Sequence, residues 1–280
     1  MRFDTTTRRV YVRQSWLNDL VICPERARLG IEYPQMRSSS DATIMGTAVH
    51  TGIELLLQGG SEEDMRRGAH EHFADLATKP FNITSIDPEQ YTELIDSMLT
   101  AYIADVLPSV QLGGQTEHRF SVPLGMVVKW GYDEWEVYVE GTMDYVQPNG
   151  TVWDWKTANR KYSIKDKQSQ SVQATVYSHA VVASGLAQYP ASFRYGIMIR
   201  AVKPQAQIVD LVRNESHTSW LRHTVEPAVQ LALSVGMDKG WVTNDTSALC
   251  SEKWCSFWSI CKGAHLSPVD LSVSPSNFGK

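Results

Sequence analysis

In the first 110 residues, apolar side chains recur every three or four positions, which is the spacing of amphipathic helices. Ser15 is placed to cap the first of these helices, and Pro24 interrupts or redirects the chain behind it. In the second helix, His50 and Glu54 lie one turn apart and share a face, and Gly59 follows its end. The pattern predicts helices over residues 15–22, 43–58, 62–77 and 88–106.

Near residue 117 the apolar period shortens to two, which is typical of strands. Residues 136–147 and 151–157 both alternate, and the segment 148–150 reads Pro-Asn-Gly, so this part is predicted to be a β-hairpin. Farther along, the pattern predicts a helix over 166–183, strands over 193–202 and 207–213, and a helix over 219–235. This order of elements indicates an α/β fold with a mixed central sheet flanked by helices.

The length and composition of the chain are those of a globular protein. Its 280 residues suffice for one large domain or two small ones. It contains no stretch of about eighteen apolar residues, and residues 1–14 carry charges where a signal peptide has an apolar centre. We therefore expect a cytoplasmic protein, in the host cytoplasm if the chain is viral, without a membrane partner.

The formal net charge of -5 gives no overall attraction to nucleic acid, so any DNA contact requires a local basic strip. One such strip lies between residues 156 and 167, where Asp166 is the single acid. Its basic members are Lys156, Arg160, Lys161, Lys165 and Lys167. The alternative interpretation of this segment is an ordinary solvated loop and helix start.

The predicted hairpin brings two acidic side chains together. If the turn uses residues 148–150, positions 147 and 151 pair, and the same register sets Asp144 opposite Asp154. Opposed like charges destabilise a sheet, so something must offset their repulsion. A divalent cation is the simplest answer, because carboxylate oxygens suit Mg²⁺ or Mn²⁺.

Strand alternation also places Lys156 on the same face as Asp154, with Trp153 and Trp155 on the other face. An ammonium group two residues from a metal-binding carboxylate can orient or deprotonate an attacking water, or stabilise charge on a phosphate. The alternative for this pair is a surface salt bridge, with Asp144 ending its strand.

Four short motifs, in order along the chain, together resemble the RecB-like and CRISPR-associated exonuclease family of the PD-(D/E)XK nuclease superfamily. They are Gly-Thr-Ala-Val-His at 46–50, Glu-Gly-Thr-Met-Asp at 140–144, Asp-Trp-Lys at 154–156 and Gln-Ala-Thr-Val-Tyr at 173–177. The resemblance implies a restriction-endonuclease-like core. The chain then forms a single nuclease domain over 1–280, with a helical insertion over 60–110.

The resemblance also implies roles for individual residues. Metal ligands would be His50, Asp144 and Asp154, together with the backbone carbonyl of Trp155, and Lys156 would be catalytic. Gln173 and Tyr177 lie one helical turn apart, so they share a face and are expected to reach the DNA backbone or to steady the lysine. Glu117 resembles a glutamate that lies near the metal in some relatives, and His118 and Glu140 are nearby alternatives.

The four cysteines are unevenly distributed: Cys23 lies near the N-terminus, whereas Cys250, Cys255 and Cys261 lie near the other end. In a reducing compartment they are poor candidates for disulfides. The iron-sulfur branch of the family has this distribution, which implies a 4Fe-4S cluster and a clasp between residues 15–35 and 245–265. The first C-terminal interval is longer than the resemblance predicts, so zinc and free thiols remain alternatives.

The sequence thus predicts a metal-dependent DNA exonuclease that uses Mg²⁺ or Mn²⁺. By resemblance, it acts on single-stranded DNA or DNA ends, often in the 5′ to 3′ direction, in recombination, repair or DNA processing. The chain has no P-loop, so a helicase would be a separate protein, as would a recombinase or integrase. The alternative is a non-catalytic DNA-binding subunit with a structural or redox-sensing metal cluster. The sequence leaves homo-oligomer formation open.

Overall fold

A mixed seven-stranded sheet forms the centre of the structure, a computed structural model that describes residues 1–37, 40–78 and 88–266. The strand order is β1-β2-β4-β5-β6-β7, and β3 pairs with β4 outside this path. The pairs β2 with β4 and β5 with β6 are parallel, and the other neighbours are antiparallel. The strands are β1 (Arg2–Asp4), β2 (Arg9–Arg13), β3 (Gln115–Trp130), β4 (Asp133–Val146), β5 (Val152–Ala158), β6 (Ala191–Ile199) and β7 (Ala206–Arg213).

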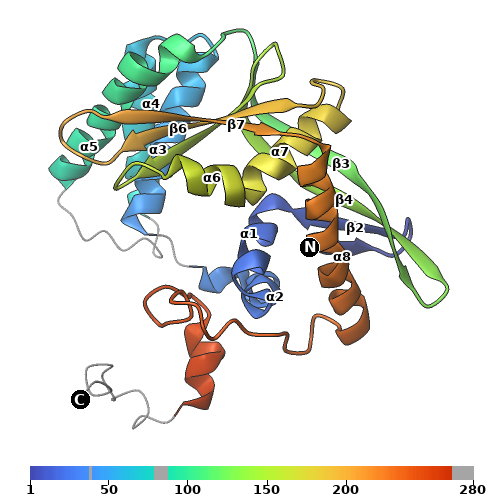
Figure 1. Cartoon of the computed structure of the whole chain (residues 1–280). Coiled ribbons are helices and arrows are strands. Elements are labelled where there is room, and N and C mark those ends of the chain that lie inside the picture. Colours follow the sequence, from blue (N-terminus) through green and yellow to red (C-terminus); the bar gives the residue numbers. More distant parts are fainter. Residues whose placement is uncertain (38–39, 79–87, 267–280) are drawn as a thin grey trace.

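Helices lie on both faces of this sheet (Figure 1). Helices α3, α4 and α5 form one group, whereas α1, α7 and α8 pack elsewhere on the sheet. The helices are α1 (Gln14–Ile22), α2 (Pro24–Glu32), α3 (Asp41–Leu57), α4 (Glu62–Ala77), α5 (Pro88–Ala101), α6 (Ile164–Gln170), α7 (Val172–Ala183) and α8 (Glu215–Val235). Short 3-10 turns cover Pro34–Met36, Leu107–Ser109, Trp258–Ile260 and Lys262–His265, and a π-helical turn covers Tyr102–Val106. The expected mixed sheet flanked by helices is confirmed.

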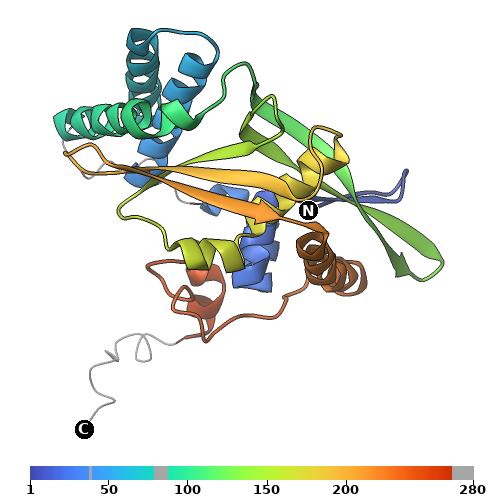
Figure 2. The same ribbon diagram turned by 45° about the horizontal axis from the view of Figure 1, so that its top comes forward.

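The long strand β4 connects two parts of the sheet. Near its start it pairs in parallel with β2, from Arg9↔Glu136 to Arg13↔Glu140. Its last residues pair with β5 instead, at Tyr145↔Trp153 and Val146↔Val152. The β3–β4 hairpin extends beyond the rest of the sheet (Figures 1 and 2). Strands β2 and β5 therefore both pair with the same edge of β4. Residues 141–144 of β4 lie between the two pairings.

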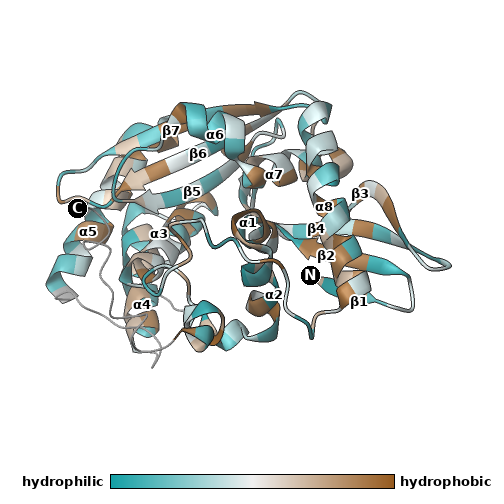
Figure 3. Ribbon diagram, turned by 60° about the horizontal axis from the view of Figure 1, so that its bottom comes forward, coloured by the Kyte–Doolittle hydropathy of each residue, from teal (hydrophilic) through white to brown (hydrophobic). Residues whose placement is uncertain are grey.

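Two groups of buried apolar side chains hold the layers together. One includes Val137 and Val139 of the sheet and packs against α1, α7 and α8. The other includes Trp153 and Trp155, which are stacked at 5.2 Å between ring centroids and pack against α3 and α5. The flanking helices carry both apolar and polar segments (Figure 3). Burying each large apolar side chain contributes about 1.5–3 kcal/mol.

Several predicted boundaries were wrong. The predicted helix over 166–183 is two helices, because Ser171 has an extended backbone (φ −81°, ψ 94°) and its side chain caps α7 by accepting a hydrogen bond from Ala174 N. Ser15 does not cap α1, whose N-cap is Arg13. Pro24 opens α2, as a proline can at the first helical position. The sequence pattern did not predict strands β1 and β2.

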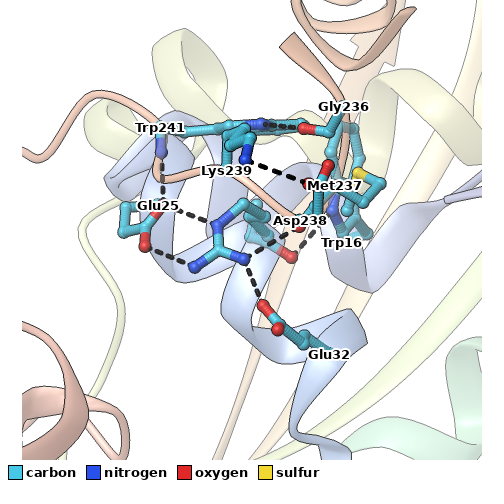
Figure 4. A network of polar contacts seen from close by, with 10 residues as sticks. Trp16, Glu25, Glu32, Gly236, Met237, Asp238, Lys239 and Trp241 are labelled. Atoms are coloured by element: carbon cyan, nitrogen blue, oxygen red, sulfur yellow. Dashed lines mark hydrogen bonds and ion pairs between the residues drawn. The ribbon is translucent and has the colours of Figure 1, made fainter.

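The C-terminal segment runs back beside α1 and α2 (Figures 1 and 2). A buried network joins them, as Figure 4 shows. Arg28 is 7% exposed, ion-pairs with Glu25 and Glu32, and donates a hydrogen bond of 2.9 Å to the Met237 carbonyl. Glu25 in turn accepts a hydrogen bond of 2.6 Å from Trp241 N. Residues more than 200 positions apart are thus joined by hydrogen bonds between the charged side chains of α2 and backbone groups of the C-terminal segment, independently of the cysteines.

Within the described residues, no helix combines the length and the apolar character needed to span a membrane.

Candidate active site

The centre of the candidate site lies where β5 separates from β4. Gln147 N donates to the Thr151 carbonyl at 2.9 Å, and the strand ladder ends at Tyr145↔Trp153. This is the register predicted from the three-residue turn, in which Gly150 has a positive φ of 79°. At the next position Asp144 Oδ2 accepts a hydrogen bond of 2.7 Å from Trp155 N. A carboxylate therefore occupies the place of a backbone partner, at the position across from Asp154.

Asp154 is held on both sides and is 1% exposed. Its Oδ1 accepts a hydrogen bond of 2.7 Å from Gln173 Nε2 of α7, and its Oδ2 forms an ion pair with Lys156 Nζ. Burial raises the pKa of Asp154 to about 6, and Asp144 adds to this effect while Lys156 opposes it. The Asp154 carboxylate is thus fixed in position by Gln173 and Lys156.

Lys156 reaches from the same strand into the cavity, with 30% of its side chain exposed. Burial by itself would lower the pKa of Lys156, but the carboxylates of Asp154 and Asp144 outweigh burial and raise it. The two carboxylates therefore favour the cationic form of Lys156. This charge favours a role in stabilising a phosphate over a role as a base, because an ammonium cannot accept a proton.

His50 comes from α3, which approaches β5 closely at Gly46. A β-carbon on Gly46 would lie 3.0 Å from Thr157 Oγ1, so the small residue permits this contact. His50 Nδ1 lies 3.5 Å from Asp144 Oδ2. Burial, and secondarily the charge of Lys156, lowers the pKa of His50 to about 4. The imidazole is therefore neutral near pH 7, the form in which histidine binds metal.

A cavity of about 670 Å³ opens in front of these groups. Its acidic lining residues are Glu54, Glu117 and Asp144, and the cationic Lys156 also faces it. Asp154 does not line the cavity, because Lys156 and Gln173 enclose it. The described structure therefore brings His50, Asp144, Asp154 and Lys156 together, with Asp154 one layer deeper than the others.

Glu117 is the glutamate that the sequence assigned with least support, and it lies in this cavity. On β3, Thr116↔Tyr145 and His118↔Met143 pair, so Glu117 is across from Asp144. Its φ of 47° is unusual for a residue other than glycine and marks local strain at the site. Partial burial raises the pKa of Glu117 to about 7, with further contributions from Asp144 and Glu54. Asp144 therefore has one carboxylate across from it on each neighbouring strand.

The two alternatives to Glu117 lie elsewhere. His118 is the next residue on β3 and does not line the cavity. Glu140 ion-pairs with Arg13 at 3.1 Å and with Arg2 at 3.6 Å, on the part of β4 that adjoins β2. Neither residue belongs to the candidate site.

Glu54 was given no role from the sequence, although it lines the cavity one helical turn from His50. The sequence did show that Glu54 shares a helix face with the proposed metal ligand His50. The missing information was where that face points. Only the packing of α3 against β5 shows this.

Gln173 and Tyr177 lie beneath the site and do not line the cavity. Gln173 Nε2 binds Asp154 and approaches Tyr177 Oη at 3.4 Å. Tyr177 is 5% exposed and donates a hydrogen bond of 2.7 Å to the Thr142 carbonyl. In this structure Gln173 steadies the Asp154–Lys156 pair, and Tyr177 connects α7 to β4. The expected contact of these two side chains with the DNA backbone stays a prediction.

The donor set in and beneath the cavity suits a hard divalent cation, since it combines carboxylates, a neutral imidazole and the Trp155 backbone. Among residues 1–37, 40–78 and 88–266, no group of three His, Cys, Asp or Glu side chains has a metal-binding arrangement. Asp154 Oδ2 is held in an ion pair with Lys156 Nζ. Metal binding at Asp154 would have to compete with Lys156.

The four cysteines line a second cavity, of about 440 Å³, between α2 and the C-terminal segment. All four are free thiols, and Asn244 N donates to Cys23 Sγ at 3.4 Å. Burial raises the pKa of the Cys250 and Cys261 thiols, and the neighbouring Cys23 and Cys255 add to this effect. The structure thus brings together all four residues assigned to a cluster, without showing a metal-binding arrangement in the part it describes.

Comparison with known proteins identifies a family. The family model of the PD-(D/E)XK nuclease superfamily matches residues 14–262. No curated protein matches the chain. A candidate exonuclease from Eubacterium rectale is similar in structure, with 12% identity, a TM-score of 0.48 and coverage of 89% of this chain and 92% of its own. The protein SSO0001 is similar with 13% identity, a TM-score of 0.40 and coverage of 92% and 87%. Similarity at this level adds nothing about function.

Proposed function

Because the chain belongs to the PD-(D/E)XK nuclease superfamily, we propose that it is a metal-dependent exonuclease of DNA. It hydrolyses phosphodiester bonds at DNA ends or in single strands, in recombination, repair or DNA processing. The observation that carries this proposal is the divergence of β4 and β5, which places Asp144, Lys156 and His50 around one cavity. A nuclease of this kind requires this combination of oxygen ligands and a cation beside the phosphate.

Asp144, His50 and the Trp155 carbonyl are the proposed ligands at the cavity wall. Asp154 is a further proposed ligand, and its ion pair with Lys156 is the contact with which the metal competes. When bound, Mg²⁺ or Mn²⁺ would lower the pKa of a water molecule and neutralise charge on the phosphate.

The chain's own side chains orient the substrate and hold its charge. Lys156 carries the positive charge that stabilises the phosphate as negative charge builds up on its oxygens. Gln173 acts as a positioning residue, because it fixes the carboxylate that holds Lys156. Glu117 and Glu54 face the same cavity and add negative charge that increases its attraction for a divalent cation.

For the cysteine cavity, we infer a metal centre held by Cys23, Cys250, Cys255 and Cys261, with a 4Fe-4S cluster as the proposed occupant. The support is that four unoxidised thiols from both ends of the chain line one cavity. Four thiolates match the ligand number of such a cluster, and also that of zinc. The centre would hold the C-terminal segment against α2 and take no part in hydrolysis.

The proposed activity is tested with purified protein and end-labelled single- and double-stranded DNA, with Mn²⁺ and with chelator. We expect shortening of the labelled strand only when metal is present. Labelling the two ends in separate reactions gives the direction of cleavage. A protein that binds DNA but leaves it intact at every metal concentration would instead be a non-catalytic DNA-binding subunit.

A further inference from the structure

A third, smaller pocket lies where α7 and α8 begin. It has a volume of about 250 Å³ and is lined by the end of α6, the first turns of both longer helices, and Arg213 at the end of β7. The lining residues used below are Thr175, Arg213, Ser216, His217 and Trp220. Two helix N-termini bring partial positive charge to this point, which favours an anion.

Arg213 supplies a full positive charge to the pocket. It is 3% exposed. Its three hydrogen bonds go to neutral acceptors: Thr175 Oγ1 at 3.2 Å, the Val212 carbonyl at 3.2 Å and the Lys167 carbonyl at 3.0 Å. In the part of the chain that the structure describes, no carboxylate pairs with Arg213. Buried charges in proteins are normally paired with an opposite charge, so this guanidinium calls for an anion from outside the chain.

The lining of the pocket suits a phosphate. A guanidinium has five N–H donors in a planar fork that matches phosphate oxygens. The three acceptors that Arg213 binds within the protein are neutral, so they do not compensate its positive charge. The Ser216 hydroxyl and the His217 ring stand beside it at the first turn of α8. Burial lowers the pKa of Arg213, and the neighbouring Tyr195 opposes this effect.

Trp220 stands at the rim of the same pocket and is 53% exposed. It also lines an adjoining surface hollow, together with Arg222 and His223. An exposed indole next to a phosphate site is a platform on which an unpaired base can stack. The two features together match one nucleotide of a single strand, whereas a paired base is not free to stack in this way.

The pocket is connected to the candidate active site through Tyr195. Ser171 Oγ at the start of α7 lies 2.7 Å from Tyr195 Oη, which approaches Gln173 Oε1 at 3.4 Å. The ammonium groups of Lys156 and Lys167 lie 5.9 and 5.5 Å from the centre of the Tyr195 ring. Lys167 therefore adjoins both places, because its ammonium group shares the Tyr195 ring with Lys156 and its backbone carbonyl accepts a hydrogen bond from Arg213. It offers a further cation to a DNA strand that passes from one to the other.

We propose that this pocket holds one nucleotide of a single DNA strand away from the cleavage site, with its phosphate on Arg213 and its base on Trp220. The proposal rests on the proposed nuclease function and names the part of the enzyme that selects single strands. The phosphate is either internal to the strand or at its end, since both offer the same oxygens to the guanidinium.

The test is binding of a fluorescently labelled thymidine oligonucleotide to the full chain in chelator, so that no cleavage occurs. Trp220→Ala removes an exposed side chain and should weaken binding about tenfold. Arg213→Gln should lower the slope of log affinity against log salt by about 0.7, the value for one lost phosphate contact on a single strand. Trp130→Ala, an exposed tryptophan on β3, and Arg67→Gln on α4 are the matched controls and should bind as the wild type does.

Oligonucleotides with and without a 5′-phosphate distinguish the two sources. If the wild type binds the phosphorylated oligonucleotide more tightly and Arg213→Gln abolishes this difference, the pocket holds a terminal phosphate. If the wild type binds both oligonucleotides equally, the pocket holds an internal phosphate. The proposal is overturned if Trp220→Ala binds single strands as tightly as the wild type. If Arg213→Gln does not fold, the result with Trp220→Ala is sufficient to decide whether the proposal holds. Cleavage by the wild type in Mn²⁺, measured separately, shows whether the nuclease function holds whichever way the pocket behaves.

Discussion

The two cavities that contain the assigned residues differ in how far the folded chain already organises them. In the acidic cavity, protein contacts fix the buried groups: Asp144 accepts from Trp155 N, and Asp154 is held by Gln173 and Lys156. In the cysteine cavity the thiols have few such contacts, and the Arg28 network beside it joins the same two segments. The acidic site is thus preorganised by the sheet, whereas the cysteine site depends on whatever its thiols bind.

Replacing Lys156 should have the largest effect on activity. Lys156→Met keeps most of the side-chain volume and removes the charge, so cleavage should fall by about 10²- to 10³-fold or more. Initial rates on end-labelled DNA in saturating Mn²⁺ measure this. Lys129→Met, an exposed lysine on β3, is the control and should retain activity. Equal activity of the two variants would remove Lys156 from the mechanism.

Loss of one cysteine should damage the second cavity and spare the first. We expect Cys23→Ser and Cys261→Ser to lose most of the bound iron and sulfide to the same extent, because a cluster with one open iron is labile. Elemental analysis after anaerobic purification measures this, together with a thermal melt. Zinc alone would convert the site to four-thiolate zinc, and a wild-type protein without either metal would refute the metal centre.

Breaking the Arg28 network should loosen the joined segments even when the cysteines are intact. Arg28→Met leaves Glu25 buried without its partner, which costs about 3–5 kcal/mol. Limited proteolysis between α8 and the C-terminus should become faster, and urea unfolding should shift to lower concentration. Arg67→Met breaks an exposed pair and should cost no more than about 1 kcal/mol. Similar effects of the two substitutions would show that the Arg28 network is not what holds the segments.

The smallest expected effect concerns repulsion inside the acidic cavity. The pKa of Glu117 is raised to about 7, above its ordinary value, so the folded protein binds the additional proton and stability falls as pH rises through this window. Glu117→Gln should therefore melt at a higher temperature than the wild type in chelator at pH 8, with little difference at pH 5. In Mn²⁺ the same variant should cleave more slowly. A constant difference in melting temperature across this pH range would contradict the assigned repulsion.

The sequence predicted those parts of the fold that depend on local pattern. The helix now seen over Asp41–Leu57 was predicted as 43–58, and the register of Asp144 with Asp154 followed from the length of the turn. Strands β1 and β2 were missed because they are short, and β2 pairs with β4 more than 120 residues away. Such a partner leaves no trace in local periodicity.

The candidate site was predictable only in part, for a related reason. Motif residues on β4, β5 and α3 were identified, but the roles of neighbouring groups depend on how elements pack. Glu54 faces the cavity because α3 lies against β5 at Gly46, and Asp154 is enclosed because α7 brings Gln173 to it. The sequence gives Arg213 no particular role, because only the fold shows that α7 and α8 begin beside it.

Calorimetry of Mn²⁺ binding to the wild type and to Asp144→Asn tests directly whether the acidic cavity is the metal site. Asparagine can still accept the hydrogen bond from Trp155 N, so the variant should keep its fold, and a melt checks this. Asp144→Asn should lose at least about tenfold in Mn²⁺ affinity, because a charged oxygen ligand is lost, while its iron content stays that of the wild type. Wild-type affinity for Mn²⁺ in a folded Asp144→Asn variant would contradict the assignment of the acidic cavity as the metal site.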